Sequence, residues 1–471
     1  MSVEATARQP QPLFVSGNEA VAWGARLARP HVIAAYPITP QTVVIERLAE
    51  WVAERKLDTE FLHVESEHSA LSACMGASAL GARTFTATSS QGLLYMAECL
   101  QYASGGRFPI VMMNANRALA LPWNIYGDQQ DSLAVLSSGW IQIYIEDAQE
   151  ALDMTIQGFA IAEHAEVLTP VMLNLDGFVL THTYEPVDVP AQVDVDAFLP
   201  PFRTPSKMSL EAPTSMGFTA GPAHYTEFKV QQHRAILRAA RVASEVDQEF
   251  GRRFGRSYGG AVVPYHCEGA DVVLVALGSV AGIVRETVDT LRARGVAAGM
   301  LKLRFLRPFP EREIVQALST ARSVGVLEKD VSFGHQGAVF SEVSSALGGS
   351  PNRPALLNFV AGLGGRDISR NDVEQMFDQL QSATVQPLNE RVRFVGVDAW
   401  KAGELCSPRT IAGGVGEAER GGASVASGFG GKGAGPEVPE GGSEGDGVAG
   451  GVPKGGANPL SVPISEENGN G

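Results

Sequence analysis

The chain is poor in cysteine and in clustered positive charge. Its four cysteines lie far apart and form no CxxC pair, so neither a disulfide framework nor a cysteine-ligated zinc or iron–sulfur site is predicted. No basic run occurs, and the formal net charge is −15 over 471 residues, which argues against a nucleic-acid-binding surface. These absences favour a reducing, cytoplasmic location and exclude nucleic acid as an expected partner.

Long apolar runs are also missing. No stretch of about 18 apolar residues is present to cross a bilayer, and the first residues, "MSVEATARQPQPLF", lack the apolar core of a signal peptide. We therefore predict no contact with a membrane. With 44% hydrophobic residues in a chain of this length, a protein of two or three domains is expected.

The two ends of the chain differ in composition from the rest. Residues 413–471 hold 20 of the 52 glycines but a single aromatic residue, Phe429. Such a segment cannot bury enough apolar surface to offset the entropy lost on ordering. The sequence thus predicts a disordered Gly-rich tail over residues 408–471 and a flexible N-terminus over residues 1–14.

Between these ends the sequence alternates strand, loop and helix. Apolar segments typical of buried strands are "HVIAAY" (31–36), "EFLHVE" (60–65), "RTFTAT" (83–88) and "PIVMMNA" (109–115), with helical patterns between them. This alternation predicts an α/β fold with a parallel sheet covered by helices on both faces, over residues 15–250 including a Pro-rich connector. A second, smaller α/β domain is predicted over residues 251–407 and contains the buried strand "ADVVLVALGSV".

Unusual residues follow the four strands of the first domain. In parallel sheets ligands bind outside the carboxyl ends of the strands, and here stand Thr39 between Pro37 and Pro40, Glu67, the segment "TSSQG" (88–92) and the segment "NANRALALPWNIYGDQQD" (114–131). Thr39 and Glu67 are also residue types that simply cap helices. The hydroxyls of "TSSQG" have no partner base, so hydrogen bonding to a ligand or to the neighbouring loop is expected.

Taken together, these segments resemble a known family. The stretches "AAYPITPQT", "VESEHSALSACMGASALGARTFTATSSQGL" and "NRALALPWNIYGDQQDS", with "GLGGRD" further on, are similar to the α subunit of the multisubunit 2-oxoacid:ferredoxin oxidoreductases, most closely the pyruvate type (pyruvate synthase). The similarity runs from about Val15 to Asp367. It implies a thiamine-diphosphate-binding pyrimidine-type domain followed by a transketolase C-terminal-like domain. The implied reaction is the reversible conversion of pyruvate and coenzyme A to acetyl-CoA and CO2, with reduction of ferredoxin or flavodoxin.

Cofactor chemistry suggests a role for one glutamate. The base of thiamine diphosphate is its own 4'-imino group, which forms when a carboxylic acid hydrogen-bonds the pyrimidine N1'. Glu65 is expected on the strand, whereas Glu67 opens the next helix after the capping Ser66, and the resemblance also puts the cofactor glutamate in the second place of "ESE". Glu67 is therefore the predicted cofactor acid.

Substrate binding is assigned to Arg117 and Thr39. Arg grips a carboxylate with parallel donors and a Thr hydroxyl adds another bond, so these two residues with Glu67 form the predicted catalytic set. An ion pair of Arg117 with an aspartate, Asp128 or Asp131, is the structural alternative. The predicted cofactor contacts are Thr39, Glu67, Ser89, Ser90 and Gln91. Gln129 stands where the family often has a histidine, and the candidates for lining the alkyl pocket are Leu119, Leu121, Pro122 and Trp123.

One expected motif is absent from the chain. Thiamine diphosphate enzymes hold Mg2+ and the diphosphate with a "GDG" motif followed by Asn, and this sequence has none. By resemblance, a β subunit would share the coenzyme by binding the diphosphate, Mg2+ and an iron–sulfur cluster, a δ-type subunit would bring further clusters, and a γ subunit would complete the assembly. No metal-binding residue is predicted in this chain. The alternatives are a branched-chain 2-oxoisovalerate oxidoreductase, a transketolase-like or acetolactate-type carboligase, and a non-catalytic scaffold.

Overall fold

The computed structural model describes residues 12–397, apart from 212, 218, 351 and 387–389. The predicted Gly-rich tail therefore lies outside the described residues. Of the predicted flexible N-terminus, Leu13 and Phe14 belong to β1 (Leu13–Ser16), which pairs antiparallel with β8 (Tyr184–Val187). Among the described residues, none of the helices combines the length and the apolar character needed to cross a lipid bilayer.

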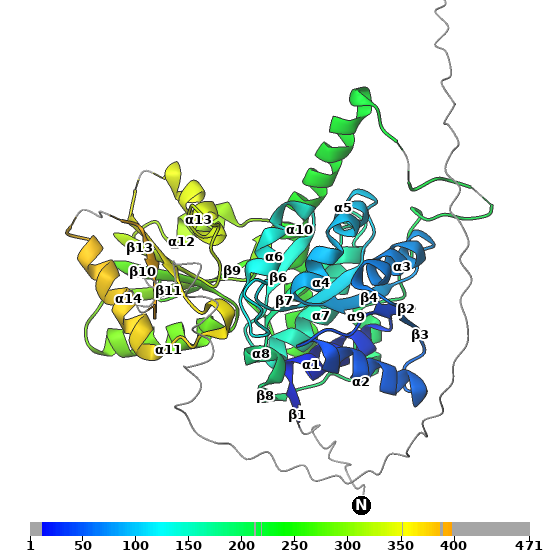
Figure 1. Ribbon diagram of the computed structural model, residues 1–471, viewed down its shortest axis with the longest axis horizontal. Coiled ribbons are helices and arrows are strands. Elements are labelled where there is room, and N and C mark those ends of the chain that lie inside the picture. The colour runs from blue at the N-terminus through cyan, green and yellow to red at the C-terminus, as the bar shows by residue number, and fades with distance from the viewer. Residues whose placement is uncertain (1–11, 212, 218, 351, 387–389, 398–471) are drawn as a thin grey trace, which may run out of the picture. The chain divides into compact units, whose positions relative to one another are not determined.

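A seven-stranded sheet forms the first part of the fold (Figure 1). Its strand order is β12-β6-β7-β5-β4-β2-β3, and every pair except β12·β6 is parallel, as the alternating sequence predicts. The strands are β2 (Val32–Ala35), β3 (Glu60–His63), β4 (Thr84–Thr88), β5 (Val111–Asn116), β6 (Ile141–Tyr144), β7 (Val171–Asp176) and β12 (Phe305–Arg307).

Helices cover both faces of this sheet. Because neighbouring side chains of a strand point to opposite faces, Val111 packs with one group of helices and Met112 with the other. The first group is α1 (Gly17–Ala28), α2 (Thr42–Ala53) and α7 (Ala148–Glu163), and the second is α3 (Glu67–Ala79), α4 (Ser90–Tyr95) and α5 (Ala97–Gly105). The helical pattern between the strands at 83–88 and 109–115 thus forms two helices, α4 and α5, which meet at Met96. The remaining elements of this part are α6 (Gln130–Ala134), η1 (Leu136–Ser138), α8 (Val179–His182), α9 (Gln192–Phe198) and the long α10 (Pro222–Phe254).

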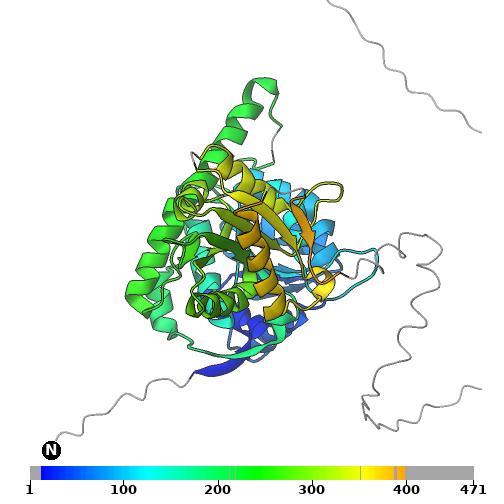
Figure 2. The ribbon, with the colours of Figure 1, turned by 90° about the vertical axis from the view of Figure 1, so that its left-hand side faces the viewer.

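A six-stranded sheet follows, in the order β15-β14-β13-β10-β11-β9. Its strands are β9 (Val262–Tyr265), β10 (Val272–Leu277), β11 (Ala298–Leu303), β13 (Ser323–Glu328), β14 (Ala355–Val360) and β15 (Val392–Phe394), with only β9 antiparallel to its neighbour. The accompanying helices are η2 (Gly278–Val280), α11 (Ala281–Ala293), α12 (Glu311–Ala317), α13 (Ala338–Gly348), η3 (Leu363–Gly365) and α14 (Arg370–Ala383). In Figure 2 the orange helix α14 crosses in front of these strands, and α11 shares one apolar core with it.

The apolar segment "AAGMLKLRF" (297–305) is split between the two sheets. β11 pairs with β10, whereas β12 pairs antiparallel with β6 of the first sheet. Arg304, 1% exposed, lies between the two strands and its Nε donates to Glu150 Oε1 over 2.7 Å, while Lys302 Nζ lies 2.9 Å from Glu150 Oε2. Burial alone would raise the pKa of Glu150, but these two cations hold it at about 2.

Candidate functional site

The loops after β2, β4 and β5 meet at the carboxyl ends of the parallel strands. Arg117, just after β5, donates from Nη1 to the carbonyl oxygen of Thr39 over 2.8 Å and from Nη2 to Gln91 Oε1 over 3.1 Å. The structure therefore brings together three of the residues that the sequence singled out, and it does so through one guanidinium group.

Thr39 contacts this guanidinium with its backbone and not with its hydroxyl. Its side chain is exposed, and the hydroxyl forms no hydrogen bond within the described part of the chain. The turn around it is braced: Asn18 Nδ2 donates to the carbonyl oxygen of Pro40 (2.8 Å), and Gln41 Nε2 donates to that of Tyr36 (2.9 Å). The two prolines thus belong to a turn whose backbone carbonyls are fixed from both sides.

Glu67 begins α3, as the sequence predicts. The hydroxyl of the N-cap Ser66 accepts from Ser69 N at 3.2 Å. Glu67 is 7% exposed, and its carboxyl forms no hydrogen bond or ion pair with any of the described residues. Glu65 differs in both respects, because it lies beyond the end of β3, is exposed, and accepts from the Ser69 hydroxyl. The expectation that Glu65 lies on the strand is therefore wrong, since β3 ends at His63.

The Glu67 carboxyl lies against α4. A Cβ built on Gly92 would stand 2.5 Å from Glu67 Oε1 and 2.7 Å from the Thr88 Oγ1 atom. Only a residue without a side chain leaves this space to the carboxyl group.

Arg117 is buried without an acidic partner for its guanidinium. The side chain is 4% exposed, Nε has no hydrogen-bond partner in the described structure, and the guanidinium carbon is 5.5 Å from the centre of the Trp123 ring. Burial lowers the pKa of Arg117, while the charges of Asp131 and Glu67 act in the opposite direction. The alternative ion pair with Asp128 or Asp131 is not formed, because Asp131 accepts from the backbone N–H of Arg117 instead.

The side chains of Ser89 and Ser90 are bound within the protein. Both are fully buried, and their hydroxyls lie 2.7 Å from the carbonyl oxygens of Ala115 and Ala118, respectively. Their hydroxyls therefore bind the neighbouring loop, which was one of the two expected partners, the other being a ligand. The Gln91 side chain is half-buried and also accepts from the Ser90 hydroxyl (2.6 Å).

Asp131 organises these loops, and sequence reasoning missed this. Its fully buried carboxylate accepts from Ser90 N (3.0 Å), Asn116 Nδ2 (2.7 Å), Arg117 N (3.1 Å) and Ser132 N (2.7 Å). Burial raises the pKa of Asp131, although these donors favour its charged form. An acid between polar residues in "GDQQDS" was the available signal, but its partners are distant in sequence.

The "GDQQDS" segment also contacts the turn that follows β14 of the second sheet. Asp128 accepts from Gly364 N (3.1 Å) in the "GLGGRD" stretch, and burial together with the nearby Asp131 raises the pKa of Asp128 to about 7. Gln129 Nε2 donates to Asp176 Oδ1 over 3.1 Å, and Asp176 also pairs with Lys329 at 3.1 Å. The "GLGGRD" and "GDQQD" stretches are therefore in direct contact.

The loop between Arg117 and Asp128 is apolar and exposed. Leu121 is 88% and Trp123 68% exposed, and Ile125 and Tyr126 are exposed as well. Leu121 therefore does not line a closed pocket in this chain. An exposed apolar patch of this kind marks a contact surface.

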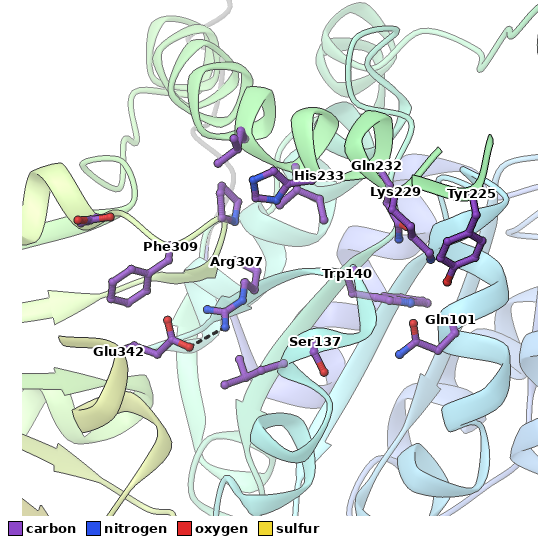
Figure 3. A pocket seen from close by; sticks show the side chains of 16 residues that line it. Gln101, Ser137, Trp140, Tyr225, Lys229, Gln232, His233, Arg307, Phe309 and Glu342 are labelled. Carbon is purple, nitrogen blue, oxygen red and sulfur yellow. Dashed lines mark hydrogen bonds and ion pairs between the residues drawn. The ribbon is translucent and has the colours of Figure 1, made fainter. Parts of the chain in front are cut away.

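A separate pocket of about 620 Å³ lies elsewhere (Figure 3). Arg307 and Glu342 pair at 2.8 Å on one side, and Tyr225 and Lys229 of α10 lie on the other. None of the site residues predicted from sequence lines it. In the part of the chain that the structure describes, no three His, Cys, Asp or Glu residues form a group suited to a metal ion.

The chain is similar in sequence to known proteins along most of the part that the structure describes. Residues 23–248 match the family described as "Pyruvate flavodoxin/ferredoxin oxidoreductase, thiamine diP-bdg", and residues 270–373 match "Pyruvate:ferredoxin oxidoreductase core domain II". The chain is 48% identical over 362 residues to pyruvate synthase subunit PorA of Methanothermobacter thermautotrophicus, covering 77% of this chain and 93% of that protein. It is 44% identical over 375 residues to ketoisovalerate oxidoreductase subunit VorA of Pyrococcus abyssi, covering 79% and 94%.

A solved structure has a similar fold. The 2-oxoglutarate:ferredoxin oxidoreductase from Magnetococcus marinus, with 2-oxoglutarate, coenzyme A and succinyl-CoA bound, superposes with a TM-score of 0.61 at 21% identity, covering 79% of this chain and 65% of that one. At this identity the likeness concerns the fold alone.

Proposed function

Because the chain belongs to the pyruvate flavodoxin/ferredoxin oxidoreductase family, we propose that it is the α subunit of a pyruvate:ferredoxin oxidoreductase. The reaction joins the acetyl group of pyruvate to coenzyme A, releases CO2, and passes two electrons to ferredoxin or flavodoxin, and it is reversible. Relatives named pyruvate synthase subunit PorA, 44–48% identical to this chain, support pyruvate as the substrate.

The observation that carries the proposal is the unpaired carboxyl group of Glu67. Thiamine diphosphate, when bound, supplies the thiazolium carbon that attacks the ketone and accepts the electron pair left by CO2. The matched family is described as thiamine-binding, and a buried acid with a free hydrogen-bonding position suits the pyrimidine N1' of that coenzyme. A carboxylate serving only the helix N-terminus would gain by facing water, yet Glu67 is 7% exposed.

We assign the substrate carboxylate to Arg117. A guanidinium has five N–H donors, and two nitrogens of Arg117 already contact Thr39 and Gln91 while its Nε remains unpaired. Those contacts fix the plane of the group, so that little ordering is needed when a carboxylate binds. Thr39 then has two functions: its carbonyl orients Arg117, and its exposed hydroxyl is free for the 2-oxo group.

The partners follow from what the chain lacks. A β subunit would bind the diphosphate and Mg2+, and iron–sulfur clusters would lie in the β and δ-type subunits, with γ completing the complex. The loop carrying Leu121 and Trp123 supports this proposal, because its exposed apolar side chains lie next to Arg117 and would be covered by the subunit that completes the coenzyme site.

The test is the Glu67→Gln variant in the complex co-expressed with its partner subunits. We expect loss of pyruvate-dependent reduction of a viologen dye, because the amide cannot share a proton with N1', while size-exclusion chromatography shows normal assembly. Glu65→Gln is the matched control, since Glu65 is exposed two residues away, and it should retain activity. Full activity of Glu67→Gln would refute the proposal and favour the scaffold, and acetolactate formation without dye reduction would favour the carboligase.

A second substrate is supported by the VorA relatives, which are 44% identical to this chain. Pyruvate and 2-oxoisovalerate differ only in the alkyl group, and a pocket discriminates such pairs by about 1–3 kcal/mol. The ratio of kcat/KM for the two acids in the assembled complex decides between them. A ratio of 10 or more in favour of 2-oxoisovalerate would reassign the protein to the branched-chain class.

A further inference from the structure

We propose that Thr88, the last residue of β4, is a positioning residue that binds one oxygen of the Glu67 carboxyl and thereby leaves the other oxygen for the coenzyme. The inference rests on the proposed function of Glu67. It assigns a specific role to the hydroxyl of Thr88, the first residue of the "TSSQG" segment.

The geometry around Gly92 places the two side chains together. The position that a Cβ of Gly92 would occupy is 2.5 Å from Glu67 Oε1 and 2.7 Å from Thr88 Oγ1. Both oxygens therefore border the same small space. Oε2 lies farther from that point than Oε1, so Oε1 is the carboxyl oxygen nearer to the space that the two side chains share.

Both groups are buried and have no partner. Thr88 is 0% exposed, and its hydroxyl forms no hydrogen bond with any described residue, Glu67 included. Glu67 is 7% exposed and its carboxyl is likewise unpaired in the described structure. Buried polar groups in folded proteins are almost always hydrogen-bonded, and a hydroxyl near a carboxylate is a donor near an acceptor. The proposed bond would satisfy both groups once the coenzyme is bound.

Such a bond would orient the acid. With Oε1 held by the Thr88 hydroxyl, the carboxyl plane is fixed and Oε2 is available to share a proton with the pyrimidine N1'. Removal of the hydroxyl should therefore weaken the contact of Glu67 with the coenzyme and leave substrate binding at Arg117 unchanged.

The strand supplies a matched control. Side chains two residues apart lie on the same face of a strand, and Thr86 is as buried as Thr88 and also lacks a partner among the described residues. Thr86 is farther from the strand end, where the loop carrying Ser89 begins. A Thr86→Val substitution thus makes the same chemical change without affecting the proposed bond.

The experiment compares Thr88→Val, Thr88→Ser and Thr86→Val in the assembled complex. For Thr88→Val we expect kcat to fall by about 10- to 100-fold, the range for a lost hydrogen bond to a charged group, with an unchanged KM for pyruvate. The dissociation constant of thiamine diphosphate, measured by isothermal titration calorimetry, should also rise about 10-fold. Thr88→Ser should stay close to the unaltered complex, and Thr86→Val should match it.

Two results would overturn the proposal: an unchanged kcat and an unchanged dissociation constant for thiamine diphosphate in Thr88→Val, or equal losses in Thr88→Val and Thr86→Val. Should the valine variant fail to assemble, Thr88→Ala is judged by the same two readouts. Glu67→Gln in parallel separates this inference from its premise. If that variant is active, the proposed function itself fails, and if it is inactive while Thr88→Val is normal, only the role of Thr88 fails.

Discussion

Replacement of Gly92 by alanine should impair the activity of the assembled complex. Gly92 lies within α4 and is not one of the glycines with positive φ, so its backbone accepts an L-residue without strain. A new Cβ would stand 2.5 Å from Glu67 Oε1 and 2.7 Å from Thr88 Oγ1, whereas ordinary contact begins at 3.4 Å. The carboxyl oxygen must therefore move by about 0.9 Å, and the Thr88 hydroxyl by about 0.7 Å.

Two effects on stability oppose each other. Alanine is favoured over glycine in a helix by up to about 1 kcal/mol, whereas crowding of the fully buried Thr88 costs about 1–3 kcal/mol. A displacement of about 1 Å in a group that must be aligned with the reacting atoms costs about 100-fold in rate. We therefore expect kcat for dye reduction to fall about 100-fold, with a melting temperature equal to or slightly below that of the unaltered complex.

Gly76→Ala provides the control. Gly76 lies in α3, the helix that Glu67 begins, and a Cβ there would have nothing within 4 Å. This substitution should add the helix stabilisation of alanine over glycine, up to about 1 kcal/mol, without crowding a neighbour, and it should leave kcat unchanged. If Gly92→Ala retains activity within a factor of about three, the carboxyl of Glu67 has no strict position in the reaction, and the reasoning from its burial is refuted.

Three further outcomes are expected. Arg117→Lys should raise the KM for pyruvate about 10- to 100-fold, because a lysine cannot replace the planar donors that the guanidinium presents, and steady-state kinetics will show an unchanged KM if the assignment is wrong. The pKa of the Asp128 carboxyl is raised from 3.8 to about 7, so the folded state binds a proton at this carboxyl more tightly than the unfolded chain does. The stability that this proton contributes is complete below about pH 4 and is lost as the pH rises through 7. Asp128→Asn should remove that slope from melting temperatures measured across this range, and an unaltered slope would contradict the assignment. Glu150→Gln leaves the buried Arg304 without a carboxylate partner, while Lys302 keeps Glu146 at 2.6 Å, and should lower the free energy of unfolding by about 3 kcal/mol in denaturant titrations. Glu245→Gln, at an exposed pair, should change it by no more than about 0.5 kcal/mol.

The choice between Glu65 and Glu67 shows how far local pattern reaches. Ser66 was predicted as the N-cap because a serine precedes a run of small, helix-compatible residues, and its hydroxyl does cap α3. The position of each glutamate relative to this cap is set by sequence spacing alone. Local rules therefore placed Glu67 at the helix start, but they put Glu65 on the strand, whereas β3 ends at His63 and Glu65 is exposed.

The partners of Arg117 could not be read in this way. An aspartate within 14 residues was a reasonable expectation, yet the guanidinium contacts Thr39, 78 residues earlier in the chain, while Asp131 binds the backbone of Arg117. Which of several nearby acids meets which donor depends on how the loops at the strand ends fold over one another.

The sequence by itself determined the alternation of strands and helices, the parallel sheet, and the residues that stand at the ends of the strands, because these depend on periodicity and on short-range capping. Tertiary structure alone decided that β12 crosses to the first sheet, that Asp131 gathers donors from two loops, and that Thr88 and Gly92 border the Glu67 carboxyl. These contacts join residues distant in the chain, and their geometry is fixed only when the whole sheet and its covering helices are packed.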